Sequence, residues 1–174
     1  FTIKRIAEIF GITVFCSGVL LLLALLSYSP DDPNFIFPEN TKIENILGFH
    51  GSFISDIFLQ SIGLVSYLFS ITLIVTGINT IRSKEIFLII ENIFFAIIYS
   101  MLGTLFFTHF YSEAFVLYIN GNGGFIGNYL NKTFLNSIIS TNEVIFYYFL
   151  IISNILLFLI SINFHPIKFY ELIK

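Results

Sequence analysis

Four long runs of apolar residues alternate with more polar segments along the chain. The runs cover about residues 6–26, 57–81, 86–107 and 144–164. A helix rises about 1.5 Å per residue, so about 20 apolar residues cross the roughly 30 Å of hydrocarbon in a bilayer. A helix also pairs its own backbone polar groups, which lipid cannot do. The pattern therefore predicts an all-α integral membrane protein with four transmembrane helices.

The composition agrees with lipid as the surrounding solvent. Hydrophobic residues make up 56% of the 174 residues and charged residues only 11%, with a mean hydropathy of +0.91. Soluble domains carry about 25% charged residues. We expect a single membrane-anchor domain over residues 1–174. Because the first residue is Phe1 and not Met, we also expect the chain to be a piece of a longer protein.

The links between the runs predict how the helices are oriented. Residues 82–85 form a link so short that the second and third helices must make an antiparallel hairpin. The other links, about 28–56 and 108–143, are long. Basic residues are enriched on the cytoplasmic side of membrane proteins. Both termini are therefore predicted in the cytoplasm, which places Lys42 and Lys132 outside and the other six cations inside: Lys4, Arg5, Arg82, Lys84, Lys168 and Lys174.

Each outer loop contains a turn signal and a candidate interfacial helix. Pro30-Asp31-Asp32-Pro33-Asn34 predicts either a turn at the membrane exit or a partner or metal contact through the acids. The apolar spacing over 43–56 indicates a helix in the membrane interface. In the second loop, the glycines of 120–127 permit a reversal between short helices at about 112–119 and 125–138. The Lys132-Thr133 pair follows Gly127 only after four further residues, so the segment lacks the G-K-[ST] ending of a phosphate-binding loop.

Candidate chemistry is sparse. Glu91 and Asn92 are the strongly polar pair inside a predicted span, which suggests proton or ion coupling. The alternative is that Glu91 snorkels to the membrane boundary or pairs with Arg82 or Lys84. The lone Cys16 excludes an intrachain disulfide, and the three scattered histidines predict no metal site. A net charge of −3 without a basic run argues against nucleic-acid binding by this segment. We predict no catalytic or cofactor-binding residue.

Three motifs resemble the N-terminal membrane domain of FtsK/SpoIIIE-type DNA translocases. Leu26-Ser27-Tyr28-Ser29-Pro30-Asp31-Asp32-Pro33 is similar to the family's S-Y-x-P-x-D-P signature. The segment from Asn45 to Asp56 is similar to N-x-x-G-x-x-G-A-x-x-A-D, with Ser52 and Ser55 in place of small apolar residues. Gly123-Gly124-Phe125-Ile126-Gly127 is similar to G-G-x-x-G before the fourth span. The family-motif residues, which the resemblance marks as candidate partner contacts, are Ser27, Tyr28, Pro30, Asp32, Pro33, Asn45, Gly48, Gly51, Asp56, Gly123, Gly124 and Gly127.

The resemblance implies a specific biological setting. The parent would be a hexameric ATPase that translocates double-stranded DNA, anchored by this domain in the bacterial inner membrane at the division septum. Its expected partners are the lipid bilayer, other cell-division proteins and further copies of itself. ATP, Mg and DNA would belong to a motor domain, because no G-x-x-x-x-G-K-[ST] occurs in the 174 residues. The alternative is a small ion-coupled transporter or channel subunit that uses Glu91 and Asn92.

Overall fold

The computed structural model describes residues 2–33, 42–112 and 120–164, and within these segments every regular element is a helix. Four of the helices are long and apolar enough to cross a membrane, namely α1, α3, α4 and α7. The predicted all-α membrane architecture is therefore confirmed. The helices are α1 (Thr2–Leu26), α2 (Gly48–Ile62), α3 (Val65–Ser83), α4 (Phe87–Phe110), α5 (Gly124–Asn131), α6 (Phe134–Thr141) and α7 (Glu143–Ser161).

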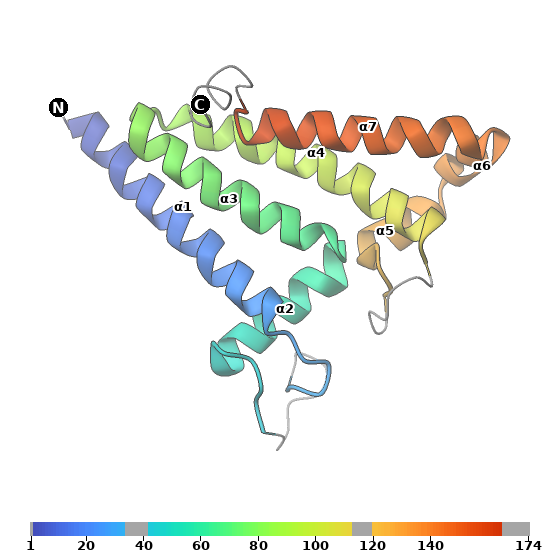
Figure 1. Ribbon diagram of the computed structural model, residues 1–174, viewed down its shortest axis with the longest axis horizontal. Coiled ribbons are helices and arrows are strands. Elements are labelled where there is room, and N and C mark those ends of the chain that lie inside the picture. The colour runs from blue at the N-terminus through green and yellow to red at the C-terminus, as the bar shows by residue number, and fades with distance from the viewer. Residues whose placement is uncertain (1, 34–41, 113–119, 165–174) are drawn as a thin grey trace, which may run out of the picture.

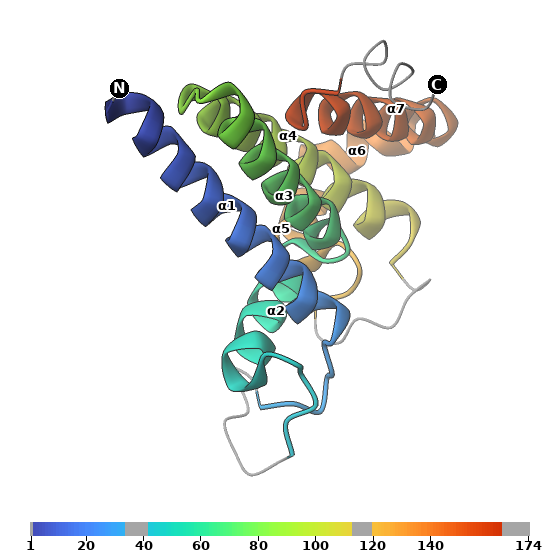
Figure 2. The same cartoon turned by 60° about the vertical axis from the view of Figure 1, so that its left-hand side comes forward.

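The four long helices are arranged like a fan (Figure 1). α1 packs along α3, α3 turns into α4, and α4 packs along α7. We call the end that carries Glu8 and Lys84 the hairpin end. We call the opposite end, built from residues 42–64 and 120–142, the loop end. The turned view in Figure 2 shows α2 lying across the last turns of α1 at this loop end. The first helix begins at the hairpin end and the last helix finishes there, so four passes return the chain to the side where it started.

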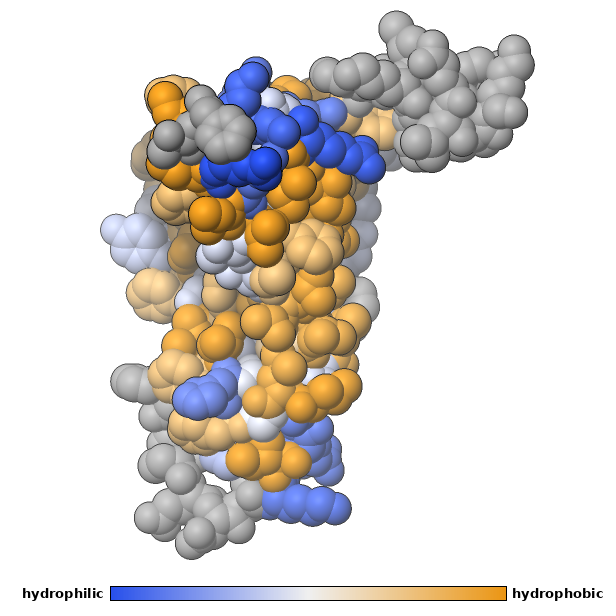
Figure 3. All heavy atoms as spheres, turned by 90° about the vertical axis from the view of Figure 1, so that its left-hand side faces the viewer, coloured by the Kyte–Doolittle hydropathy of each residue, from blue (hydrophilic) through white to orange (hydrophobic). Residues whose placement is uncertain are grey.

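The surface of the fan has an apolar middle and polar ends. Figure 3 shows a belt of hydrophobic side chains between two groups of hydrophilic ones, at the hairpin end and at the loop end. α7 illustrates the belt, because large apolar side chains such as Phe149 and Ile152 are more than half exposed. Exposed apolar area on this scale requires lipid around it. The chain is a multi-pass membrane protein.

Glycines let α1 and α3 approach each other closely. A Cβ added at Gly18 would lie 2.7 Å from the backbone nitrogen of Ile74, and one at Gly77 would lie 2.5 Å from that of Phe15. Real Cβ atoms do not approach so closely, so both positions require the small residue. Packing through small residues is a usual way to hold membrane helices together, because lipid removes the hydrophobic drive between them.

The structure differs from the sequence prediction in the second span. An uninterrupted helix was expected over 57–81, but α2 ends at Ile62 and α3 begins at Val65. Gly63 has φ +58° and ψ −141°, a conformation that favours glycine. The next backbone N–H, that of Leu64, donates to the carbonyl of Asn122 at 2.9 Å instead of continuing the helix. A contact with the distant second loop therefore breaks the run.

The short helices also differ from the expected ones. The interfacial helix expected over 43–56 begins at Gly48 and continues to Ile62. The single helix expected over 125–138 is two helices, because Thr133 caps a new start by accepting a 3.3 Å hydrogen bond from the N–H of Leu135. The helix expected over 112–119 and the cations Lys168 and Lys174 lie outside the described residues.

Candidate functional site at the loop end

The acid of the first motif is a structural latch. Asp32 is 3% exposed, and its two carboxylate oxygens accept hydrogen bonds from the backbone N–H groups of Glu44 at 2.7 Å and Asn45 at 2.9 Å. Hydrogen bonds to a charged acceptor are stronger than neutral ones. Asp32 therefore holds the segment that enters α2 against the turn that leaves α1. Pro30 lies in that turn, and the carbonyl of Pro33 accepts a 2.7 Å bond from the hydroxyl of Ser52.

Asn45 connects the same segment to the end of α1. Its side-chain NH₂ donates to the carbonyls of Ala24 at 2.9 Å and Ser27 at 3.2 Å, two of the carbonyls that the end of a helix leaves unpaired. The Ser27 hydroxyl accepts from the N–H of Ile46 at 3.2 Å. A Cβ at Gly51 would collide with the Asn45 side-chain oxygen. The first two motifs thus form one interlocked unit, which we call the Asp32–Asn45 latch.

Asp56 extends this unit towards the second loop. Its carboxylate is 3% exposed and accepts bonds from Tyr28 at 3.4 Å and Gln60 at 3.5 Å. Burial raises the pKa of the Asp56 carboxyl, and the hydrogen bonds from Gln60 and Tyr28 lower it in part. The Gln60 side-chain oxygen in turn accepts a 3.0 Å bond from Asn120. A chain of side chains therefore links the first loop to the second.

The glycine motif packs where the second run is broken. A Cβ at Gly123 or Gly127 would collide with Thr108 on α4, and one at Gly124 would lie 2.6 Å from the carbonyl of Ser61 at the end of α2. These close contacts bring the second loop against α2 and α4 at once. Gly48 is different, because it has φ +65° and no atom near its missing Cβ.

The intramembrane polar pair separates into two unlike residues. Asn92 is fully buried, donates to Thr76 on α3 at 3.0 Å, and accepts from Asn163 at 3.0 Å just after α7. Nearby, Thr72 lies 2.9 Å from the Tyr99 hydroxyl. We call these contacts the polar seam. They join α3, α4 and the end of α7, as interhelical hydrogen bonds do in membranes.

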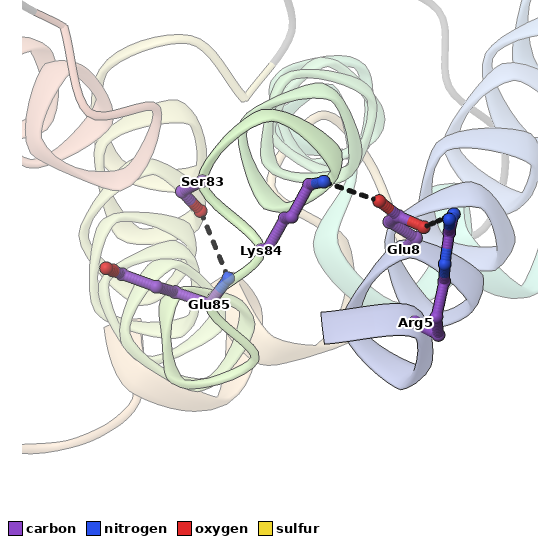
Figure 4. A network of polar contacts seen from close by, with 5 residues as sticks. All are labelled: Arg5, Glu8, Ser83, Lys84 and Glu85. Atoms are coloured by element: carbon purple, nitrogen blue, oxygen red, sulfur yellow. Dashed lines mark hydrogen bonds and ion pairs between the residues drawn. The ribbon is translucent and has the colours of Figure 1, made fainter. Parts of the chain in front are cut away.

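Glu91 is exposed on α4, and it has no ion pair among the described residues. The expected pairing with Arg82 or Lys84 is not present in this part of the chain. The Lys84 ammonium instead lies 2.9 Å from Glu8 on α1, which also pairs with Arg5 at 2.7 Å (Figure 4). Lys84 has φ +62° at the end of α3, and this turn directs its side chain towards α1.

The polar contacts of the loop end hold the shape of this part of the chain. Within residues 2–33, 42–112 and 120–164, no group of three or more His, Cys, Asp or Glu side chains is placed to hold a metal ion. The carboxylates of Asp32 and Asp56 are occupied by hydrogen bonds within the chain. The features define a four-span membrane domain whose two long loops are fastened to each other.

Comparison with known proteins identifies the family. Residues 3–170 match the family described as the 4TM region of DNA translocase FtsK/SpoIIIE, and the chain belongs to this family. A "DNA translocase FtsK" of Caulobacter vibrioides is 35% identical over 68 residues, which are 39% of this chain and 8% of that protein. A "DNA translocase FtsK" of Azospirillum brasilense is 28% identical over 88 residues, which are 49% of this chain and 14% of that protein. No solved structure matches the chain.

Sequence reasoning did not single out Gln60 or Asn122, and it interpreted Gly63 only as a small residue that lets helices approach closely. Gln60 and Gly63 lie inside an apolar run, where they look like tolerated exceptions in a span. Asn122 lies in the segment whose glycines were expected to permit a reversal, yet it is 1% exposed and donates through its side chain to the carbonyl of Tyr111. The available signal for a break in the helix was Gln60, a side-chain amide inside an apolar run, followed three residues later by Gly63.

Proposed function

We propose that this chain anchors an FtsK-type DNA translocase in the bacterial inner membrane and directs it to the division septum. There the protein would couple chromosome segregation to cell division. Family membership and the relatives' printed names support this proposal. The segments matched are only 8–14% of those two relatives' own length. The ATP-driven motor, with its Mg and DNA, belongs in this proposal to a part of the protein outside the 174 residues.

In the proposed orientation, both ends of the chain lie in the cytoplasm. The helical contacts support a common side for the two ends, because Glu8 pairs with Lys84 and Asn163 pairs with Asn92. The preference of basic residues for the cytoplasmic side supports the choice of that side, since Arg5 and Lys84 are at the hairpin end. The loop end then faces the periplasm.

We further propose that the loop end is the surface that other cell-division proteins recognise. The observation that carries this proposal is the Asp32–Asn45 latch, which fixes the segment leading into α2 on the end of α1. A loop with a fixed shape loses less conformational entropy when a partner binds. Self-association, up to a hexamer through the motor, would add avidity without new contacts.

A localisation experiment tests the orientation and the septal targeting separately. A fluorescent protein is fused to the C-terminus of the full-length protein, and its distribution is recorded in dividing cells together with a topology reporter at the same position. We expect a mid-cell band and a cytoplasmic reporter. A periplasmic reporter would contradict the orientation, and uniform membrane fluorescence would contradict septal targeting.

Two variants separate recognition by the loop from simple anchoring. Asp32→Ala removes the acceptor of the latch, and we expect it to remain in the membrane but lose the mid-cell band. Glu44→Ala is the matched control, because its backbone N–H still donates to Asp32 while its exposed side chain is removed. A normal mid-cell band in Asp32→Ala would show that the latch is not needed for recognition.

A further inference from the structure

A cavity of about 430 Å³ lies at the loop end between α1, α2 and the neighbouring face of α3. From α1 it is lined by Leu20, Leu21 and Ala24, and from α2 by Ile54 and Phe58. The α1 residues follow the spacing i, i+1 and i+4, and the α2 residues are four apart, so each helix turns one face towards the gap. The apolar faces of α1 and α2 thus lie on opposite sides of the cavity and do not pack against each other there.

The chemistry of the lining selects an apolar occupant. Among the lining residues only Ser17 and His50 have polar side chains, and none is Asp, Glu, Lys or Arg. The volume falls within the roughly 300–1,000 Å³ of ligand-binding cavities. An empty apolar gap of this size would forfeit dispersion contacts along both helices, which a hydrocarbon chain would restore.

The cavity is continuous with the lipid-facing surface. Leu20, on the spanning helix α1, is 52% exposed and so belongs both to the cavity wall and to the apolar belt around the domain, and Ile54 is 43% exposed on the facing helix α2. The medium against that belt is the acyl chains of the bilayer. A chain from the adjacent lipid therefore reaches the cavity without crossing a polar barrier.

We propose that this cavity binds one acyl chain of a phospholipid from the leaflet at the loop end. Ser17 lies almost two turns along α1 from Ala24 towards the hairpin end, whereas His50 lies near the start of α2 at the loop end. The acyl chain would therefore run inward from His50 to Ser17, with the headgroup near the exposed His50 imidazole. The proposal rests on the membrane location of the domain and is independent of the proposed role at the septum.

The test uses the protein reconstituted into vesicles of phosphatidylethanolamine and phosphatidylglycerol, with a small fraction of phosphatidylglycerol that carries a diazirine on its acyl chain. After illumination, peptide mass spectrometry locates the lipid adducts. We expect adducts on the cavity residues Leu20 and Ile54 to be severalfold more abundant than on Ile9 and Ile12, which are at least as exposed on α1 but lie outside the cavity. Equal labelling of the two groups would overturn the proposal.

A pair of variants sharpens the result. Ser17→Phe places an aromatic ring in the cavity, and we expect it to reduce the cavity adducts severalfold. Thr13→Phe is the matched control, because Thr13 is also an exposed hydroxyl residue, one turn away on the same face of α1 and outside the cavity. Unchanged labelling in Ser17→Phe would overturn the proposal, as would crosslinks to a second copy of the chain at Leu20. If Ser17→Phe does not fold, the comparison of residues in the unmodified protein still decides.

Discussion

The carboxylate of Asp32 accepts a 2.9 Å hydrogen bond from the backbone N–H of Asn45, and the Asn45 side chain donates to the last turn of α1. The chain therefore leaves α1, passes through Asp32 and Asn45, and is fastened back to the end of α1 by the Asn45 side chain. Both carboxylate oxygens of Asp32 accept backbone N–H groups of the same chain, so this acid holds the shape of the loop. In the proposed function, a partner would contact the surface that the latch positions.

Removing the latch should destabilise the domain. In Asp32→Ala the amides of Glu44 and Asn45 lose their acceptor, and an unpaired buried group costs about 1–3 kcal/mol. We expect a lower thermal unfolding midpoint in nanodiscs. Glu44→Ala should leave the midpoint unchanged, because its backbone donor is retained. Equal midpoints for the wild type and Asp32→Ala would show that the latch contributes nothing to stability.

The break between α2 and α3 should require glycine at position 63. In Gly63→Ala the added methyl meets the carbonyl of Asn122 while the backbone keeps a strained conformation that costs about 1–3 kcal/mol. Gly48→Ala tests strain alone, because Gly48 also has a positive φ but no neighbour, and about 1–2 kcal/mol is expected. Unfolding in denaturant should rank Gly63→Ala as the less stable variant, and the reverse order would contradict the role of Asn122.

Glu91 and Asn92 are neighbours in sequence with opposite expected effects. Asn92→Ala leaves Thr76 and Asn163 without their partner, and interhelical hydrogen bonds in membranes are worth about 1 kcal/mol. The unfolding midpoint should fall. Glu91→Gln should change it little, since Glu91 is exposed and makes no ion pair with the described residues. A larger effect from Glu91→Gln, on stability or on function in cells, would revive a coupling role for this acid.

The contact between Glu8 and Lys84 should respond to salt. Glu8→Gln removes an ion pair that fastens α1 to the α3–α4 turn, so the unfolding midpoint should fall at low ionic strength. The difference from the wild type should shrink at high ionic strength, because salt screens exposed pairs. Glu85→Gln is the control, since its side chain points away from Lys84 (Figure 4). A salt-independent difference would indicate a packing effect instead.

Asp56 should give the stability a measurable pH dependence. Burial raises the pKa of its carboxyl in the folded state, so the folded chain holds this proton more tightly than the unfolded chain does. The protonated Asp56 carboxyl therefore stabilises the folded state at low pH, and this contribution is lost as pH rises through the pKa of the folded state. Asp56→Asn keeps an oxygen for Tyr28 and Gln60 and removes the titration. We expect its unfolding midpoint to depend less on pH than that of the wild type.

A neutral neighbour provides the control for this measurement. Ser52 lies about one turn before Asp56 on α2, and Ser52→Ala removes its hydrogen bond to the Pro33 carbonyl. It should lower the unfolding midpoint by a similar amount at every pH. If Ser52→Ala and Asp56→Asn altered the pH profile in the same way, the dependence would come from the loop as a whole and not from Asp56.

Hydropathy predicted the four spanning helices because lipid allows few alternatives for a long apolar segment. The same reasoning missed the break at Gly63, because the competing acceptor, Asn122, lies far away in sequence. Proximity along the chain also suggested Arg82 or Lys84 as a partner for Glu91. The left-handed turn at Lys84 directs the ammonium to Glu8 on another helix instead. The local sequence pattern predicted the structure where the surrounding lipid determines it. It failed where the structure depends on a residue that is distant in the sequence.

The motif residues show a similar division. The cluster around Asp32 was interpreted as a turn or as a contact for a partner or metal, and its position in a turn was readable from its prolines. Its bonds to residues 44 and 45 were not, because nothing in the spacing indicates which amides return to it. The role of these residues in partner recognition stays a prediction.

The contacts of Gln60 with Asn120 and of Leu64 with Asn122 have a consequence for any molecule that binds the loop end. The two long loops form one connected surface, so a ligand that shifts one loop must also displace the other. By thermodynamic reciprocity, a ligand on one loop would change the affinity of a second ligand for the other loop by the same factor as the second ligand changes the affinity of the first. A synthetic peptide copied from either loop alone would lack this support and should mimic the intact surface poorly.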